Sequence, residues 1–196
     1  MRAAEIRERL RAPWVHGQAL DLRGLVVAEA LDLSGLALFG ADFTGSRFEG
    51  GVIARGARFD GLSWFSDCHF ASADFSGALF VNDARFDNAT FATAPQFHDA
   101  EFRGIARFDG ATMPGGDFRA LTCYGNAAFA GVDGGALDLS GSEFLGGFWA
   151  QTAQFAPGAR FDDTQVHGRL WLRRARLGNA ALTPGAFGLC YGYAWT

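Results

Sequence analysis

Hydrophobic residues in this chain recur in short, regular steps along almost the whole sequence. From Leu22, steps of only five or six residues lead through 32 positions to Phe187 without a break. The residue two places before each position is usually small, most often Ala. We call the 32 positions slots, and they are Leu22, Val27, Leu33, Leu38, Phe43, Phe48, Ile53, Phe59, Phe65, Phe70, Phe75, Phe80, Phe86, Phe91, Phe97, Phe102, Phe108, Met113, Phe118, Cys123, Phe129, Gly134, Leu139, Phe144, Trp149, Phe155, Phe161, Val166, Leu172, Leu177, Leu182 and Phe187.

This spacing predicts very short strands and not helices. A helix would need apolar residues three and four apart, whereas here a pair two apart is followed by a polar stretch. Side chains alternate across a strand, so a small residue and its slot point inward on either side of one outward residue. The Gly, Ser, Asp and Asn residues between the pairs suit turns. A chain that turns after every short strand must coil, and stacked coils let each backbone segment pair with its neighbours above and below.

Three segments identify the family that this pattern resembles. Ala41-Asp42-Phe43-Thr44-Gly45, Ala73-Asp74-Phe75-Ser76-Gly77 and Leu137-Asp138-Leu139-Ser140-Gly141 follow the order small, acidic, large apolar, hydroxyl, Gly. The chain is similar in this respect to members of the pentapeptide-repeat family from about Leu20 to Phe187. The resemblance implies an all-β fold, a right-handed quadrilateral β-helix with four units per coil. Thirty-two slots then form about eight coils, a stack of roughly 38 Å at about 4.8 Å per coil.

Every fourth slot should lie on the same face, so the register predicts interior columns of rings. One column is Phe43, Phe65, Phe86, Phe108 and Phe129 on the first face. Another is Phe75, Phe97, Phe118, Leu139 and Phe161 on the third face. A core closed by stacked rings accounts for 18 of the 20 Phe of the chain and leaves no hollow for a cofactor.

The two ends and one internal stretch depart from the repeat. Residues 1–19 are predicted to form an N-terminal cap with a short amphipathic helix over Ala3 to Arg11, ended by Pro13. Residues 20–187 form the repeat body, with a bulge or small loop expected over Ala130 to Ala136, where Gly134 occupies a slot. Residues 188–196 are apolar and form either a cap or a dimerisation segment. Family resemblance implies a homodimer through this end, with the aromatic anchors Trp171, Tyr191, Tyr193 and Trp195.

Composition and targeting signals narrow the class of protein. The chain is 49% hydrophobic and 19% charged, which suits one domain with a sizeable core. It contains neither a long apolar run nor an N-terminal secretory signal, so we expect a cytoplasmic protein without a membrane span. Cys68, Cys123 and Cys190 are odd in number and far apart, which favours reduced structural thiols.

Residues that could act in catalysis or bind a metal do not cluster into a predicted active site. His16, His69, His98 and His167 are neither stacked nor adjacent in the register, so no metal site is expected. Asp162 and Asp163 beside Arg160 are more typical of a solvated corner than of a general acid and base. The glycines mark corners and not a phosphate-binding loop. We therefore expect a protein without catalytic residues, cofactor or metal.

Charge is distributed unevenly along the chain. Residues 21–163 carry 19 acidic residues and 9 arginines, a net charge of −10, whereas residues 164–196 carry four arginines and no acid. Carboxylates concentrate on the third face of the register, where we expect an acidic, partner-binding column. Its members are Asp32, Asp74, Asp99, Asp117, Asp138, Asp162 and Asp163. Asp before the slot is also the repeat consensus, which is the competing explanation.

Two functions fit these observations. Some proteins of the family that this chain resembles bind DNA gyrase or topoisomerase IV by imitating duplex DNA, so the resemblance implies a type II topoisomerase as partner and no direct contact with nucleic acid. Duplex DNA of about 38 Å would carry on the order of 22 charges, and an excess of ten is under half of that density. The alternative is a general protein-interaction scaffold with another partner, because fold alone does not decide function.

Overall fold

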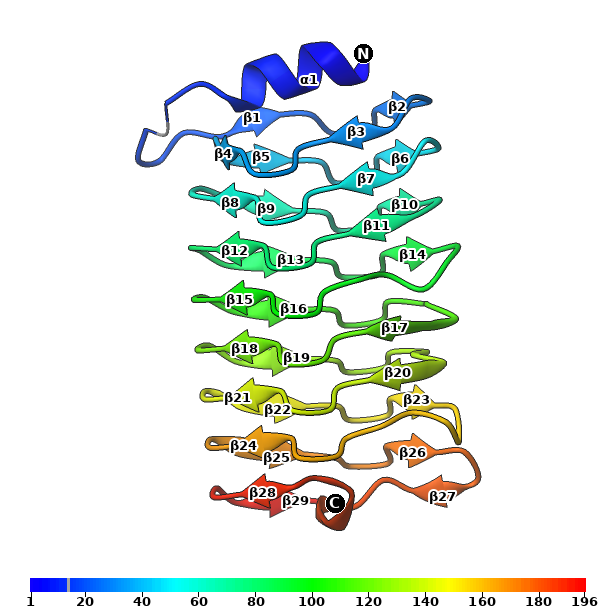
Figure 1. Cartoon of the computed structure of the whole chain (residues 1–196). Helices are drawn as coiled ribbons and strands as arrows, with labels where there is room; N and C mark the ends of the chain where they lie inside the picture. Colours follow the sequence, from blue (N-terminus) through cyan, green and yellow to red (C-terminus); the bar gives the residue numbers. More distant parts are fainter. Residues whose placement is uncertain (14) are drawn as a thin grey trace.

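The computed structural model describes residues 1–13 and 15–196 as a straight stack of rectangular coils (Figure 1). The helix α1 (Ala3–Leu10) covers one end, and the chain terminates at the other. Strands mostly two residues long alternate with corners, and nearly all pair in parallel with the strands directly above and below. This is the right-handed quadrilateral β-helix of about eight coils that the sequence predicts. The four sides are called faces 1 to 4 in chain order.

Faces 1 and 2 form the first half of each coil. Face 1 holds β1 (Leu20–Asp21), β5 (Ala41–Asp42), β9 (Ser63–Trp64), β13 (Ala84–Arg85), β16 (Ala106–Arg107), β19 (Ala127–Ala128), β22 (Gly147–Trp149), β25 (Arg169–Trp171) and β29 (Ala194–Trp195). Face 2 holds β2 (Val26–Val27), β6 (Arg47–Phe48), β10 (His69–Phe70), β14 (Thr90–Phe91), β23 (Gln154–Phe155) and β26 (Arg176–Leu177).

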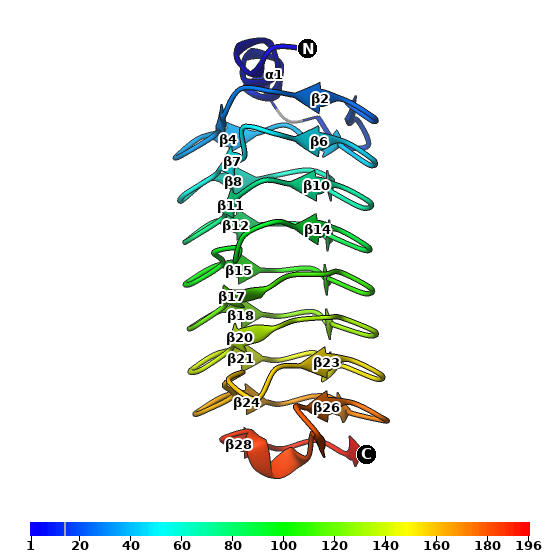
Figure 2. The same cartoon turned by 90° about the vertical axis from the view of Figure 1, so that its right-hand side faces the viewer.

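Faces 3 and 4 complete each coil, and Figure 2 shows the stack from the side. Face 3 holds β3 (Leu31–Asp32), β7 (Val52–Ile53), β11 (Ala73–Asp74), β17 (Gly115–Asp117) and β20 (Ala136–Asp138). Face 4 holds β4 (Ala37–Leu38), β8 (Arg58–Phe59), β12 (Leu79–Phe80), β15 (Glu101–Phe102), β18 (Thr122–Cys123), β21 (Glu143–Phe144), β24 (Gln165–Val166) and β28 (Leu189–Cys190).

The interior is filled by phenylalanine, and all 20 Phe are buried. Phe65 and Phe86 on face 1 stack with ring centroids 5.1 Å apart and planes 9° apart. Phe75 and Phe97 on face 3 stack at 5.0 Å and 12°. Rings of different faces meet edge to face across the middle of the coil, as Phe75 and Phe86 do at 5.5 Å and 75°. Both ring geometries are favourable, so the predicted columns on faces 1 and 3 form one continuous core.

Two corners of each coil require a left-handed backbone. The second residue after the slot on faces 1 and 3 has a positive φ, for example Gly24 (63°) and Gly35 (66°). Asn88 (54°) and Asp99 (56°) occupy the equivalent positions in later coils. Gly, Asn and Asp tolerate this conformation better than other residues, which explains the turn residues at the repeat corners.

Two predicted slots are wrong by one residue. Ile53 lies on the outer side of face 3 beside Asp32 and Asp74 in register, and Ala54 is the inward residue. Trp149 likewise lies outside, in register with Trp171. The inward residue there is Ala150, which is fully buried.

In both places the large side chain has moved to the other inward position of the same strand. Val52 and Phe148, which stand two residues before Ala54 and Ala150, are both buried. A small slot and a large preceding residue fill about the same volume as the usual arrangement. The spacing rule failed here because it assigned the slot to the larger of two neighbouring residues.

The stretch around Gly134 contains no protruding loop, contrary to expectation. Asp133 bridges Thr112 above and Gln154 below, so the backbone of face 2 stays paired. A Cβ added at Gly134 would lie 2.9 Å from the ring of Phe155, which shows that this ring from the next coil fills the space that a larger slot residue would occupy. Packing of Phe155 compensates for the missing side chain, and the neighbouring Gly135 takes a left-handed backbone with φ of 53°.

The last predicted slot is also wrong. After β26 the chain folds back as β27 (Ala180–Ala181), which pairs antiparallel with β26, and a 3₁₀ turn follows at Pro184–Ala186. Phe187 is buried against Phe161, with centroids 5.0 Å apart, and does not take the face 4 position. Cys190 takes that position, in register with Val166.

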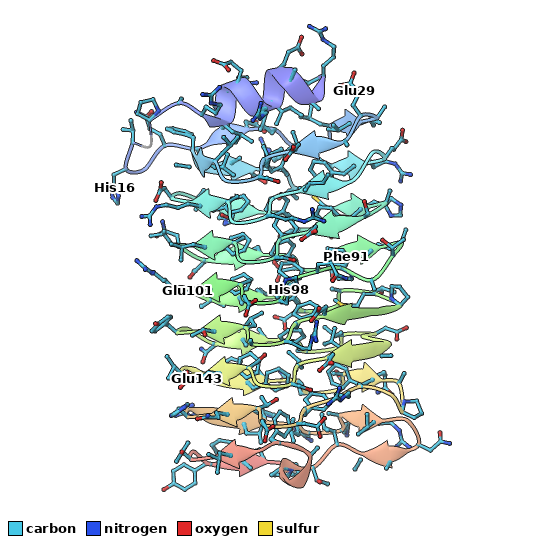
Figure 3. The ribbon with its side chains drawn as sticks, in the orientation of Figure 1. His16, Glu29, Phe91, His98, Glu101 and Glu143 are labelled. Carbon is cyan, nitrogen blue, oxygen red and sulfur yellow. The ribbon has the colours of Figure 1, made fainter. Side chains whose placement is uncertain are left out.

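The N-terminal cap folds as the sequence predicts. Ile6 and Leu10 of α1 are buried against the first coil. The backbone N–H of Ala3 donates to Glu29 at 3.0 Å, and Figure 3 shows Glu29 beside the start of the helix. The N–H of Phe39 donates to the carbonyl of Leu10 at 2.7 Å. The helix therefore covers the apolar end of the core.

Candidate functional site: the acidic column of face 3

The outward residues of face 3 form a single line along the rod. Backbone register places Asp32, Ile53, Asp74, Gln96, Asp117, Asp138 and Arg160 one above another. Four of these seven are aspartates, and they are the four that the sequence placed just before the slots of the third face. We call Asp32, Asp74, Asp117 and Asp138 the acidic column. Short rigid strands hold its carboxylates on the outer surface at a spacing set by β-pairing.

The other predicted acidic residues lie beside this column and not in it. Asp99 and Asp163 have φ values of 56° and 55°, so they occupy the left-handed corner between faces 3 and 4. Asp162 is exposed and follows the slot residue Phe161. His98, next to Asp99, lies at the same corner, near the middle of the rod (Figure 3).

Arginines neutralise much of the acidic column. Arg55 Nε donates to Asp74 Oδ2 at 2.5 Å. Arg119 Nε and Nη2 donate to Asp117 Oδ1 and Oδ2 at 2.8 and 2.7 Å. Arg160 lies 3.6 Å from Asp138 and 2.9 Å from Asp162.

Sequence reasoning did not single out these ion pairs. Asp117 and Arg119, like Arg160 and Asp162, are two residues apart, which puts both side chains on the same side of an extended backbone. That spacing is the signal that predicts the pairs. The Arg55–Asp74 and Arg160–Asp138 contacts join adjacent coils and can be assigned only once the register is known.

Hydrogen bonds hold Asp32, Asp74 and Asp117 in their charged form. The Arg119 guanidinium lowers the pKa of Asp117 below its usual value. The N–H of Ser34 lowers the pKa of Asp32. Burial raises the pKa of Asp74, but hydrogen bonds from Ser76 and Arg55 outweigh it, and the net shift is downward. These three carboxylates therefore stay ionised at a pH where free aspartate begins to protonate.

Ser76, His98 and Asp117 come together but lack the geometry of a catalytic triad. Ser76 Oγ lies 3.1 Å from His98 Nδ1, and Asp117 Oδ2 lies 3.7 Å from the same nitrogen. A triad needs the serine and the carboxylate on different ring nitrogens, so that the imidazole passes a proton between them. Ser76 Oγ also donates to Asp74 at 2.6 Å. This cluster is a structural network of the acidic column.

The cysteines and the other histidines form no further cluster with metal-binding potential. Within residues 1–13 and 15–196, no group of three or more His, Cys, Asp or Glu side chains is arranged to hold a metal ion. Cys68 and Cys123 are buried, and burial raises the pKa of each thiol to about 12. These thiols are poor nucleophiles at neutral pH because the thiolate is the reactive form.

The four C-terminal aromatic residues lie on two faces and a corner. Trp171 and Trp195 project outward from face 1, with ring centroids 5.5 Å apart. Tyr191 stacks on His167 on face 4, at 4.8 Å. Tyr193 lies between β28 and β29 and is 81% exposed. Trp171, Trp195 and Tyr193 therefore form a chain of neighbouring rings, and Tyr191 packs separately on face 4.

Comparisons with known proteins show which family part of this chain is similar to. Residues 34–79 and 54–94 match a family model described as pentapeptide repeats (9 copies). The same coil geometry extends beyond those residues, from β1 to β26. Residues 34–94 therefore belong to the pentapeptide-repeat family, and the coils before and after them have the same geometry. A comparison with curated proteins gave no match.

One solved structure with a similar chain is full-length QnrB1, a plasmid-mediated fluoroquinolone resistance protein. It is 17% identical and covers 91% of this chain and 94% of its own, with a TM-score of 0.25. At that TM-score the two chains do not superpose as wholes, so the likeness carries no argument about the partner. Among the residues that the structure describes, no helix is long and apolar enough to cross a membrane.

Proposed function

We propose that this chain is a non-enzymatic protein-binding rod that recognises a type II topoisomerase, DNA gyrase or topoisomerase IV, through the acidic column of face 3. The observation that carries the proposal is the alignment of Asp32, Asp74, Asp117 and Asp138 along one face. Fixed carboxylates in one line, one or two coils apart, resemble the phosphates along one strand of duplex DNA. The proposal places this interaction in the cytoplasm.

The magnitude of the charge limits how the imitation would work. Residues 21–163 carry a net charge of −10, whereas about 38 Å of duplex carries on the order of 22 charges. Recognition by total charge is therefore weak. Binding must depend on the arrangement of carboxylates on one face, with Arg55, Arg119 and Arg160 keeping them in position.

A second candidate function is a scaffold for a different protein partner. The ion pairs of Arg55, Arg119 and Arg160 with the column favour it, because paired carboxylates attract a DNA-binding surface less than free ones do. The two candidates share the same rod and the same outward side chains. They differ in whether a topoisomerase responds to the protein.

Self-association through the C-terminal end is part of the proposal. The strands β28 and β29 are the last of faces 4 and 1, and each has one unpaired edge. Leu189, Tyr191 and Tyr193 are exposed nearby. Exposed aromatic side chains beside open strand edges suit a two-fold contact between copies of the chain.

A supercoiling assay with matched variants tests the topoisomerase partner. The Asp74→Arg, Asp117→Arg and Asp138→Arg triple variant should lose any effect of the protein on gyrase while keeping its β-helix. The control changes the same number of charges on faces 2 and 4, with Asp133→Arg, Glu101→Arg and Glu143→Arg. Glu101 and Glu143 lie above one another on face 4 (Figure 3). Equal loss in both variants would show that bulk charge and not the acidic column is responsible.

A further inference from the structure

The outward residues of face 1 change from acidic in the first coils to aromatic in the last coils. Its outward residues in the first two coils are Asp21 and Asp42. In the last three coils they are Trp149, Trp171 and Trp195, which follow one another in backbone register. Their ring centroids are 6.2 Å apart between the first two and 5.5 Å apart between the last two. We call these three residues the tryptophan ladder.

Arginines without acidic partners surround the tryptophan ladder. Among the described residues, Arg169, Arg173 and Arg174 take part in no ion pair, whereas most arginines of residues 21–163 do. No acidic residue follows Asp163 in the sequence. The Arg169 guanidinium lies 5.9 Å from the centre of the Trp195 ring, within range of a cation–π interaction. Positive charge is thus held next to an aromatic surface and is not neutralised within the chain.

A hollow of about 250 Å³ opens beside the ladder. It is lined by Gln151, Thr152, Trp171, Arg173 and Arg174 at the corner between faces 1 and 2. Its lining thus combines one aromatic residue, Trp171, with two arginines, Arg173 and Arg174. A hollow of this size suits one or two side chains of a partner and not a drug-sized ligand.

The orientation of the rings decides what kind of surface the ladder presents. Trp171 and Trp195 stack on each other with planes 28° apart, so each shields one ring face of the other, and Trp149 packs at a tilt of 58° on the other side of Trp171. The Nε1 atoms of Trp149 and Trp171 are covered and have no hydrogen-bond partner. The exposed edges of Trp149 and Trp171 are therefore hydrocarbon. Bases or sugars need open ring faces for stacking, whereas apolar side chains pack well against such an edge.

We propose that the tryptophan ladder, with Arg169, Arg173 and Arg174, is a docking surface for an acidic protein segment that carries large apolar side chains. Carboxylates of the segment pair with the free guanidinium groups, and its apolar side chains pack on the indole edges and into the hollow. Tryptophan and arginine are the residues that most often dominate protein interfaces. Charge complementarity selects an acidic partner. The surface lies on face 1, opposite the acidic column of face 3, so it does not depend on the topoisomerase proposal.

Binding of a defined probe tests this proposal on the full-length chain. The probe is a fluorescein-labelled peptide of repeated Glu-Glu-Leu-Phe units, followed by fluorescence anisotropy at low salt. The expected result is saturable binding, weakened about tenfold or more by Arg173→Glu and by Trp171→Ala. Matched controls are Arg47→Glu, an exposed arginine of face 2, and Trp64→Ala, which lies on face 1 four coils before Trp149. Both controls should bind like the wild type.

Every other outcome counts against the proposal. Equal binding of a peptide with Lys in place of Glu would remove the charge argument. Tighter binding of single-stranded oligothymidine that is lost in Arg173→Glu would make the surface a nucleic-acid site. If Trp171→Ala converts a dimer into a monomer in sedimentation experiments and leaves peptide binding unchanged, the occupant is a second copy. Circular dichroism of each variant distinguishes loss of folding from loss of binding.

Discussion

Phe148 and Ala150 face the core from the same strand with their sizes exchanged relative to the coil before. Ala127 and Phe129 hold the corresponding positions there, with the small residue first. Phe148 nevertheless continues the ring stack, with its centroid 5.2 Å from that of Phe129. The core therefore tolerates either order of small and large residues within a strand.

This exchange predicts a non-additive pair of substitutions. Phe148→Ala alone should lower the free energy of unfolding by about 3–5 kcal/mol, because it leaves a cavity. Ala150→Phe alone should cost about 1–3 kcal/mol through overpacking. The double variant restores the common order and should be more stable than the sum of the two single effects, measured by denaturant unfolding. Simple additivity would mean that the two positions do not share one space.

Phe97 in the middle of the face 3 column tests the ring stack itself. Its ring packs between Phe75 and Phe118, at centroid distances of 5.0 and 4.8 Å. Phe97→Ala should lower the free energy of unfolding by about 3–5 kcal/mol. Gln96→Ala, on the outer side of the same segment, is the control and should change it by less than about 0.5 kcal/mol. A loss under about 1 kcal/mol for Phe97→Ala would contradict its burial in a tightly packed column.

The buried thiols predict a stability that falls at alkaline pH. Burial raises the pKa of Cys68 and Cys123 to about 12, above the value of 9.0 for a free thiol. The contribution of these thiols to stability is complete below pH 9 and is lost as the pH rises towards 12, because only the unfolded chain ionises them easily. Unfolding measured across this range should show the loss, and a Cys68→Ala, Cys123→Ala variant should show less of it.

The same thiols should be protected from modification in the folded protein. Only Cys190, which is partly exposed, should react with a disulfide reagent at pH 8, and all three cysteines should react after unfolding. Mass spectrometry of the labelled peptides identifies the reactive residue. Rapid labelling of Cys68 in the native protein would contradict its position in the core.

Removing residues after Phe187 tests the proposed two-fold contact. The full chain should be a dimer by light scattering, and the truncated chain should be a folded monomer. A truncated chain that is still dimeric, or a full chain that is already monomeric, would rule out the C-terminal interface. Unfolding of the truncated chain would show that β28 and β29 act as a cap, because they pair with β24 and β25.

Most of the fold could be predicted because every coil must bury apolar side chains on each of its faces. Each coil needs two inward residues per face, a small one and a large one. Phe is the large one so often that the register can be read from the sequence. The rule failed at Ile53 and Trp149, where an apolar residue faces outward and its small neighbour faces inward. At Phe187 it failed because the hairpin of β26 and β27 interrupts the period.

The outer surface was less predictable than the core. The register alone places Asp32, Asp74, Asp117 and Asp138 in one line, whereas the other predicted members, Asp99, Asp162 and Asp163, lie beside it. The contacts of Arg55 with Asp74 and of Arg160 with Asp138 depend on side-chain reach between coils, which spacing does not determine. The tryptophan ladder was missed because Trp149 had been assigned to the interior. A surface that is built from residues about 22 apart becomes visible only when every outward position is assigned correctly.

Competition with duplex DNA tests the central claim most directly. Labelled duplex bound to the gyrase holoenzyme is titrated with the chain at low salt, and the released DNA is measured. The account predicts that the wild type displaces DNA at micromolar concentration, that added salt weakens the displacement steeply, and that the Asp74→Arg, Asp117→Arg and Asp138→Arg variant displaces none. DNA that stays bound in the presence of the wild-type chain would contradict recognition of this topoisomerase by the acidic column.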